Sequence, residues 1–294
     1  MGVERCLVVT ADDFGASAAV NQAVITAWEQ GILTSASLMV TGAAADEAVA
    51  LARARPGLAV GLHLVLTEGR PCLPPEMVPA LVGADGGFPR RLVWTGVRWF
   101  LSPAARAQIQ REVRAQVGRF QKTGLRLDHL DSHHHFHLHP VVFGALLGAA
   151  EEAGVRALRL PVEPWFVLGL DQAGRGRAAL LLLLFHLLGA LYRRRLRARG
   201  FLILDGVFGL LQTGRLTETS LLALLEALPP GCFELYTHPR LDTPAGRAEL
   251  QALTSPRVRE AVVRRGVRLT TYGALLAGAS SGRWGHQPGR SDGG

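Results

Sequence analysis

The chain has 294 residues, of which 48% are hydrophobic and 19% charged, and its formal net charge is +8. The length fits one large α/β domain or two small ones, and the composition allows a sizeable core and excludes a globally disordered chain. A basic balance suits nucleic acid or an anionic lipid surface. Lys122 is the only lysine, however, so the arginine excess also fits a genome-wide compositional bias. The charge is dispersed and no aromatic residues interleave the arginines, so we expect no nucleic-acid partner.

The cysteines and the N-terminal residues indicate a reducing compartment. Cys6, Cys72 and Cys232 are far apart and form no CxxC pair, so neither a disulfide framework nor a cysteine-based zinc site is predicted. The first residues run directly into a strand and show no signal-peptide pattern. We therefore expect a cytoplasmic protein.

Strand and helix patterns alternate along the chain, which predicts an α/β fold with a parallel sheet or barrel. The expected strands are Cys6–Thr10, Thr34–Val40, Leu58–Val65, Leu125–Asp131, Val155–Leu160, Phe201–Leu204, Phe233–Tyr236 and Val267–Thr270. The expected helices are Ser17–Gln30, Ala43–Arg55, Pro103–Lys122, Val141–Ala153, Thr217–Leu228 and Pro256–Arg265. About seven βα units fit an incomplete TIM-type barrel.

The remaining segments fall outside this repeating pattern. Residues 66–101 are rich in proline and glycine and are expected to form a long loop with short helices that lines the binding site. A single domain is predicted over residues 1–278. The tail 279–294 is rich in glycine and serine and is expected to be disordered.

Two groups of polar residues follow the ends of early strands, where parallel α/β folds build their sites. Asp12 and Asp13 are adjacent and cannot point the same way on an extended backbone. One can therefore bind a metal while the other faces the reaction. His63 ends the third expected strand and is a candidate imidazole ligand. Taken alone, the aspartates also fit a helix cap, and His63 also fits a structural role.

The most informative stretch of the sequence is the segment from Asp128 to Pro140, DHLDSHHHFHLHP, which holds six of the ten histidines. Imidazole is a common metal ligand and a general acid or base near neutral pH. In an extended stretch alternate residues share one face. Side chains expected to face one pocket are Asp131, His133, His135 and His137. With the aspartates and His63, these groups form a plausible open metal site with room for water.

Three further residues stand at or near the ends of later strands. His238 is a candidate proton donor for the departing amine of an amide substrate. Arg159 can orient a carboxylate or the substrate, and Tyr236 lies two residues before His238. We expect His135, His137, Arg159 and Tyr236 to line the substrate-binding part of the site.

These motifs resemble the YdjC-like carbohydrate deacetylases, also called chitooligosaccharide deacetylases. The resemblance rests on TADDFG at 10–15, GLH at 61–63, LDSHHHFH at 130–137 and THP at 237–239, and it spans roughly residues 5–275. It implies a distorted TIM-like barrel and one divalent metal, magnesium or zinc, held by Asp13, His63 and His133. It also implies Asp12 as the general base that activates water and His238 as the general acid.

The segment 165–200 departs from compact members of such a family. Ala178–Tyr192 is largely aliphatic and is followed by five arginines, which suits a helix docked on an anionic membrane surface at the inner face of the cytoplasmic membrane. A buried barrel helix with cations at its carboxyl end is the alternative. The overall pattern resembles the hopanoid-biosynthesis-associated branch. This resemblance implies a lipid-linked N-acetylglucosamine substrate.

Several alternatives stay open from sequence alone. The substrate could be a soluble chito-disaccharide instead of a lipid-linked sugar. A non-catalytic metal- or sugar-binding protein on the same barrel would need a broken site, whereas the expected ligand set is intact. A metal-dependent phosphoesterase would normally need a second metal and phosphate clamps. The oligomeric state, a homo-oligomer included, is not determined.

Overall fold

A computed structural model describes residues 4–169 and 175–280, and its centre is a parallel sheet. The strands are β1 Arg5–Phe14, β2 Ser35–Leu38, β3 Ala59–Leu64, β4 Leu127–Ser132, β5 Gly206–Phe208, β6 Gly231–Thr237 and β7 Val267–Thr270. Their order is β4-β3-β2-β1-β6-β5, and β7 pairs with β1 beside its first half. β1 is buried along nearly its whole length, which explains its continuous apolar run before the aspartates.

The sheet curls into a distorted barrel that closes through two irregular segments. Arg159 donates its backbone N–H to the carbonyl of Leu130 in β4. On the other side, Leu202 donates to Arg156, and Val207 in β5 donates to Val162. β5 then pairs with β6, which returns to β1. This arrangement agrees with the expected α/β fold and distorted TIM-like barrel.

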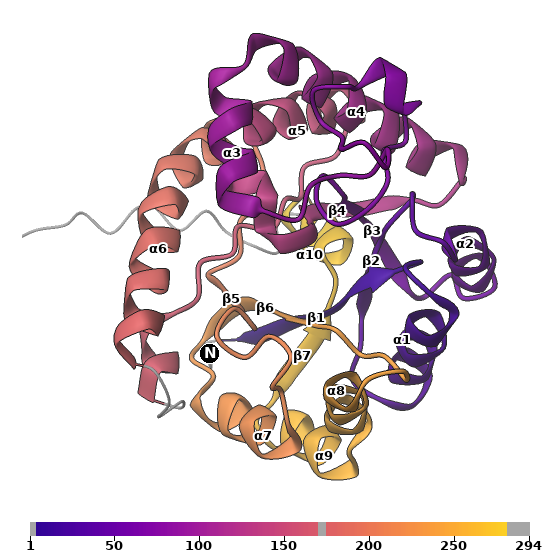
Figure 1. Ribbon diagram of the computed structural model, residues 1–294. Coiled ribbons are helices and arrows are strands. Elements are labelled where there is room, and N and C mark those ends of the chain that lie inside the picture. The colour runs from indigo at the N-terminus through magenta and orange to yellow at the C-terminus, as the bar shows by residue number, and fades with distance from the viewer. Residues whose placement is uncertain (1–3, 170–174, 281–294) are drawn as a thin grey trace, which may run out of the picture.

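Helices surround the sheet on its outer side, except α10, which is seen within the ring of strands (Figure 1). They are α1 Ala18–Gln30, α2 Ala45–Arg53, α3 Leu92–Leu101, α4 Pro103–Lys122, α5 Pro140–Glu152, α6 Arg175–Ala198, α7 Glu218–Ala227, α8 Pro244–Thr254, α9 Pro256–Arg264 and α10 Tyr272–Ser280. Side-chain caps fix several helix starts, and Ser17 accepts from the backbone N–H of Val20 at the start of α1.

The structure corrects part of the expected element list. Val155–Leu160 and Phe201–Leu204 do not form strands, because in each segment only isolated bridges pair with a neighbour, at Ala157, Leu158 and Leu202. β5 lies just after the second segment instead. Helices α8 and α10 were not expected. Residues 66–101, which were expected to form a loop with short helices, contain helix α3, which is more than two turns long. Of the expected disordered tail 279–294, Ala279 and Ser280 instead end helix α10, and residues 281–294 lie outside the described residues.

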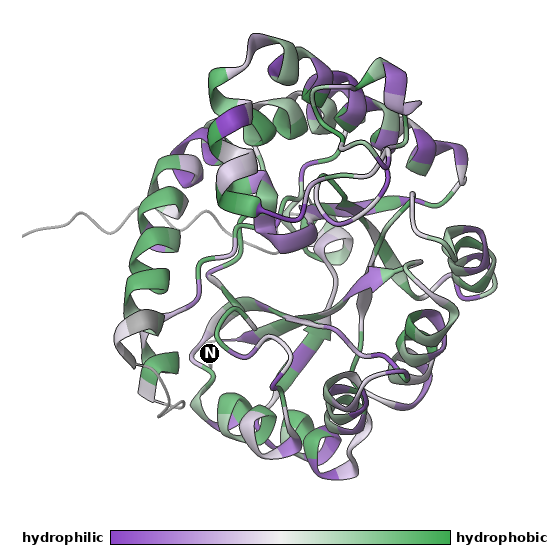
Figure 2. Ribbon diagram, in the orientation of Figure 1, coloured by the Kyte–Doolittle hydropathy of each residue, from purple (hydrophilic) through white to green (hydrophobic). Residues whose placement is uncertain are grey.

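Helix α6 covers one flank of the barrel with one face and exposes the other. Leu182, Tyr192 and Leu196 are buried, and the Tyr192 hydroxyl donates to the carbonyl of Leu138 at 2.9 Å. Leu180 and Leu187 are more than 60% exposed. Figure 2 shows the hydrophobic character of this helix along much of its length. Within the described residues, none of the helices combines the length and apolarity needed to cross a bilayer.

Substitutions at two glycines, one in crowded and one in open surroundings, can test how tightly the barrel is packed behind the site. A Cβ at Gly61 in β3 would lie 2.5 Å from the His129 ring, whereas a Cβ at Gly118 in α4 would meet nothing within 4 Å. We expect Gly61→Ala to destabilise the fold by about 1–3 kcal/mol through overpacking. Gly118→Ala should stabilise it by about 0.5–1 kcal/mol through helix propensity. Urea unfolding of both variants measures the difference, and equal effects would contradict this account.

Candidate metal and active site

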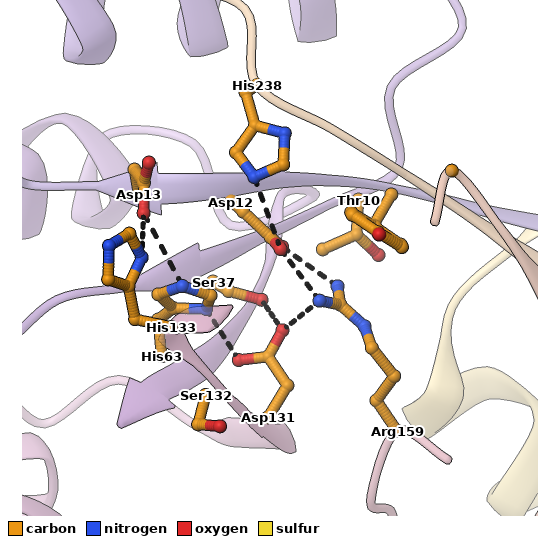
Figure 3. A network of polar contacts seen from close by, with 12 residues as sticks. Thr10, Asp12, Asp13, Ser37, His63, Asp131, Ser132, His133, Arg159 and His238 are labelled. Carbon is orange, nitrogen blue, oxygen red and sulfur yellow. Dashed lines mark hydrogen bonds and ion pairs between the residues drawn. The ribbon is translucent and has the colours of Figure 1, made fainter. Parts of the chain in front are cut away.

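The candidate site lies at the carboxyl ends of the strands, where barrel folds place their chemistry (Figure 3). Asp12 and Asp13 stand at the end of β1, His63 at the end of β3, and Asp131 at the end of β4. His238 follows β6 directly. Four strands thus bring together residues from four distant parts of the chain.

Three side chains converge in the geometry of a metal site. The Asp13 Oδ1 atom lies 3.1 Å from His133 Nδ1 and 3.4 Å from His63 Nε2. The ligand atoms of the three residues all lie within 4.8 Å of one another. Asp13 Oδ1 and His63 Nε2 are buried and have no hydrogen-bond partner. Two unpartnered acceptors that face each other in this way fit a bound cation, and the donor set suits a divalent metal.

A hydrogen bond behind His63 orients this candidate ligand. Its Nδ1 lies 2.9 Å from Asp131 Oδ1, so the proton on Nδ1 leaves the Nε2 lone pair free to face Asp13. Burial opposes the charged imidazole, but the charges of Asp131, Asp12 and Asp13 raise the pKa of His63 to about 9. Without a metal the ring is therefore protonated near neutral pH, and a cation at Nε2 would replace the second proton and leave the one that Asp131 holds on Nδ1.

Arg159 lies at the centre of a buried network of ion pairs with three carboxylates. Its Nη1 and Nη2 atoms bind the two Asp12 carboxylate oxygens at 2.7 and 2.8 Å, and Nη1 also lies 2.7 Å from Asp131 Oδ2. Its Nε and Nη2 donate to Glu234. Burial opposes its charge, yet these three carboxylates hold the pKa of Arg159 well above its usual value.

The network carries more negative than positive charge. Asp12, Asp131 and Glu234 are 2% exposed or less, and all three share the single guanidinium of Arg159. Asp13 adds a fourth carboxylate nearby. Burial alone would raise the pKa of Asp13, but the close contact with His133 and the charges of His63 and His238 lower it. A bound cation would balance this excess charge, which supports the fit of a metal.

His238 and Asp12 face each other across the open side of the site. His238 Nε2 lies 4.0 Å from Asp12 Oδ2, and the His238 side chain is 25% exposed. Its Nδ1 is buried without a hydrogen-bond partner. The Tyr236 ring lies between Arg159, whose guanidinium carbon is 4.9 Å from the ring centre, and the imidazole of His238 at 5.7 Å. A reacting group can therefore meet both a carboxylate and an imidazole.

The histidine segment does not continue as an extended strand. β4 ends at Ser132, and residues His133–Leu138 form a 3-10 turn in which His134 and His135 adopt positive φ angles of 55° and 53°. The expected alternation of facing side chains therefore fails after Ser132. Asp131 and His133 both reach the site, but they do so from a strand and from a turn.

The structure places the four expected substrate-binding residues differently from one another. His137 is fully buried, and its ring nitrogens contact Ser132 Oγ and the carbonyl of Arg159. Arg159 is also fully buried and occupied by carboxylates. We expected both to contact the substrate, but their polar atoms are engaged within the protein. His135 and Tyr236 lie against each other at 4.9 Å, and His135 Nδ1 has no partner.

Sequence reasoning missed Glu234, Ser37 and the specific role of Asp131. Glu234 accepts hydrogen bonds from Thr10 and Tyr272 as well as from Arg159. Ser37 donates to Asp131 Oδ2 at 2.9 Å. A carboxylate in the middle of the buried strand β6 was the one available signal, because charged residues are rarely buried without a partner.

Comparison with known proteins assigns the family. The model of the family described as YdjC-like protein matches residues 6–264. The chain belongs to the YdjC-like family. A carbohydrate deacetylase from Geobacillus stearothermophilus is 34% identical over 279 residues, which cover 91% of this chain and 97% of that protein. One from Brevibacillus brevis strain 47 is 45% identical over 160 residues, or 54% of this chain and 59% of that protein.

A solved structure of a protein with a related sequence has the same fold as this chain. An Enterococcus faecalis V583 protein, whose proposed activity is cellobiose-phosphate cleavage, matches with a TM-score of 0.71 and 28% identity. The match covers 92% of this YdjC-like chain and 99% of that chain. The two proteins therefore share the same overall fold.

The hydrogen bond between Asp131 and His63 can be tested through metal affinity. In Asp131→Asn the carboxylate that holds the His63 tautomer is lost, so zinc affinity should fall by about 10–100-fold. Titration of metal-stripped protein against a competing chelator measures this change. Asp46→Asn, at an exposed position of α2, is the matched control and should bind zinc normally. Unchanged affinity in a folded Asp131→Asn protein would contradict the orienting role.

Proposed function

We propose that this enzyme hydrolyses the N-acetyl group of an N-acetylglucosamine unit and releases acetate and a free amino sugar. The observation that carries the proposal is the pairing of Asp12 with His238 beside the converging ligands Asp13, His63 and His133. Amide hydrolysis needs a base, an acid and a group that polarises the carbonyl. The carbohydrate deacetylases that align with the chain support this reaction.

The proposed metal is one divalent ion held by Asp13, His63 and His133. When bound, such an ion supplies Lewis-acid polarisation of the acetyl carbonyl and acidifies water. A ligand set of two imidazoles and one carboxylate favours zinc or another transition metal over magnesium. The unpartnered Asp13 Oδ1 and His63 Nε2 atoms support this assignment.

Asp12 is the proposed general base. Both of its oxygens accept from Arg159, which fixes the plane of the carboxylate, and each oxygen retains a further lone pair. Asp12 takes a proton from the water that attacks the acetyl carbon. Because Arg159 is itself buried and fixed by Glu234, Asp12 cannot rotate away from the reacting group.

His238 is the proposed general acid, since the sugar amine must gain a proton as the C–N bond breaks. Its backbone N–H donates to Glu249 at 2.6 Å, which anchors the residue after β6. His135 and Tyr236 are proposed to contact the sugar. Burial and then the charge of Arg159 lower the pKa of His135 well below its usual value, so its ring stays neutral and can hydrogen-bond to a hydroxyl.

The proposed substrate is lipid-linked, as in a glycosylated hopanoid, with a soluble chito-disaccharide as the second candidate. The exposed leucines of α6 favour the first, because a soluble sugar gives no reason for an apolar surface next to the active-site loop. The proposed location is the cytoplasm, at the inner face of the cytoplasmic membrane.

The outer face of α6 is proposed to dock on anionic lipid. Leu187 and Leu191 are about 60% exposed, at 62% and 58%, and the carboxyl end of the helix carries Arg194, Arg195 and Arg197. An apolar face with a cationic end matches the interface of a negatively charged bilayer.

The reaction can be tested by acetate release from metal-stripped and zinc-reloaded protein. We expect activity only with metal, on a detergent-dispersed N-acetylglucosaminyl lipid more than on N,N′-diacetylchitobiose. His63→Ala should lose both zinc and activity. Asp12→Asn should keep zinc but lose activity by about a hundredfold or more, because only the base is removed. Full turnover in Asp12→Asn would refute the base. Zinc binding without acetate from any substrate would favour a non-catalytic binding protein.

Membrane docking can be tested by sedimentation with liposomes. Leu187→Glu with Leu191→Glu should reduce binding to vesicles containing anionic phosphatidylglycerol by about tenfold or more, since both changes remove apolar contact and add repulsion. Val263→Glu, at an 80% exposed position of α9, is the control. Equal binding of all three proteins would refute docking through α6.

A further inference from the structure

An apolar groove lies between helices α3 and α6, beside the histidine turn that follows β4. It is open to solvent and has a volume of about 540 Å³. Val93, Val97 and Phe100 of α3 form one wall, and Phe185 and Leu188 of α6 form the other. His135 lies at its inner end. Figure 1 shows α3 beside the upper part of α6, on the side of the barrel that carries the histidine turn.

A continuous row of rings joins this groove to the proposed general acid. His238 lies 5.7 Å from Tyr236, and Tyr236 lies 4.9 Å from His135. His135 in turn lies 6.0 Å from Phe185 of α6. All three contacts are edge-to-face, with interplanar angles of 83° to 85°. His135 therefore lines the groove and also packs against Tyr236, which contacts the proposed general acid.

The chemistry of the walls selects the occupant. Apart from imidazoles, the groove is lined by aliphatic and aromatic side chains, and the Nε2 atom of one of these imidazoles, His139, already bonds to the carbonyl of Gly96 at 3.0 Å. A second sugar ring would bring several hydroxyls into a channel with few partners, which costs free energy for each unsatisfied group. A hydrocarbon chain or ring system gains free energy there instead.

The outer mouth of the groove opens on an apolar rim. Val93 is 84% exposed, and Leu101 is 70% exposed. Trp94 of α3 and Leu187 of α6 do not line the groove, but they add exposed apolar surface to the same two helices. A groove that is polar at its inner end and apolar at its outer end matches an amphiphile whose sugar reaches the catalytic residues while its tail points outward.

We propose that the α3–α6 groove binds the hydrocarbon portion of the substrate while its N-acetylated sugar occupies the site. This inference rests on the proposed function, because it requires the amino sugar to be the group held beside Asp12 and His238. Val97 and Leu188 are then specificity-determining residues that touch the tail and not the reacting amide.

Binding can be measured without turnover in zinc-loaded Asp12→Asn protein. By calorimetry, octyl β-N-acetylglucosaminide should bind at least about tenfold more tightly than the methyl glycoside. Adding Val97→Asp should remove this gain, because the new carboxylate faces the tail. Val263→Asp makes the same change at an exposed helix position remote from the groove and should retain the gain. Leu188→Ala, a milder change in the opposite wall, should reduce it. Equal affinity for the two glycosides, or a gain unaffected by Val97→Asp, would overturn the assignment.

Acetate release separates this assignment from the proposed reaction. With Asp12 intact, Val97→Asp should lower kcat/KM for the octyl glycoside by about tenfold and leave the methyl glycoside unchanged. An octyl preference in binding with no acetate from either glycoside would confirm the groove and refute the deacetylase. Acetate released from both glycosides at equal kcat/KM would support the deacetylase and overturn the groove.

Discussion

Arg159 holds three carboxylates from three strands inside the barrel, and the geometry of the site depends on this contact. Asp12 comes from β1, Asp131 from β4 and Glu234 from β6, so one guanidinium links strands that are far apart in the sequence. A buried charge of this kind contributes little net stability, because desolvation offsets most of the attraction. Its effect is positional. Through Asp12 it orients the proposed base, and through Asp131 it orients His63, so the base and a metal ligand share one support.

Backbone strain is concentrated around this network. Among the described residues, the non-glycine positions with positive φ are Asp13, Glu68, His134 and His135, and Asp13, His134 and His135 belong to the two site segments. The Glu68 carboxylate contacts the His134 imidazole. Each such conformation costs on the order of 1–3 kcal/mol and persists only where the surroundings fix it. The barrel core supplies that constraint, and the strained backbone turns Asp13 toward both imidazoles.

The histidines that follow β4 are close together in the sequence, but each has a different position and different contacts in the structure. His133 faces Asp13, His137 is buried beneath the site, and His139 bonds to Gly96 in α3. His135 lies on the surface common to the site and the α3–α6 groove. The turn therefore joins polar chemistry on one side to the apolar groove on the other, an arrangement that would suit the proposed amphiphilic substrate.

The sequence alone determined the barrel class and most strand positions, and its resemblance to a known family implied the residues of the proposed metal site. Strands buried on both faces leave continuous apolar runs, and the polar residues that end them stand out at TADDFG, GLH and LDSHHH. Tertiary structure alone decided which side chains meet. Arg159 and Glu234 are 75 positions apart, so no local pattern could pair them, and the weak pairing of Val155–Leu160 depends on neighbours that the pattern does not specify. The groove could not be predicted from the sequence either, because its two walls come from α3 and α6. An exposed apolar residue on one helix indicates a groove only when the position of the second helix is known.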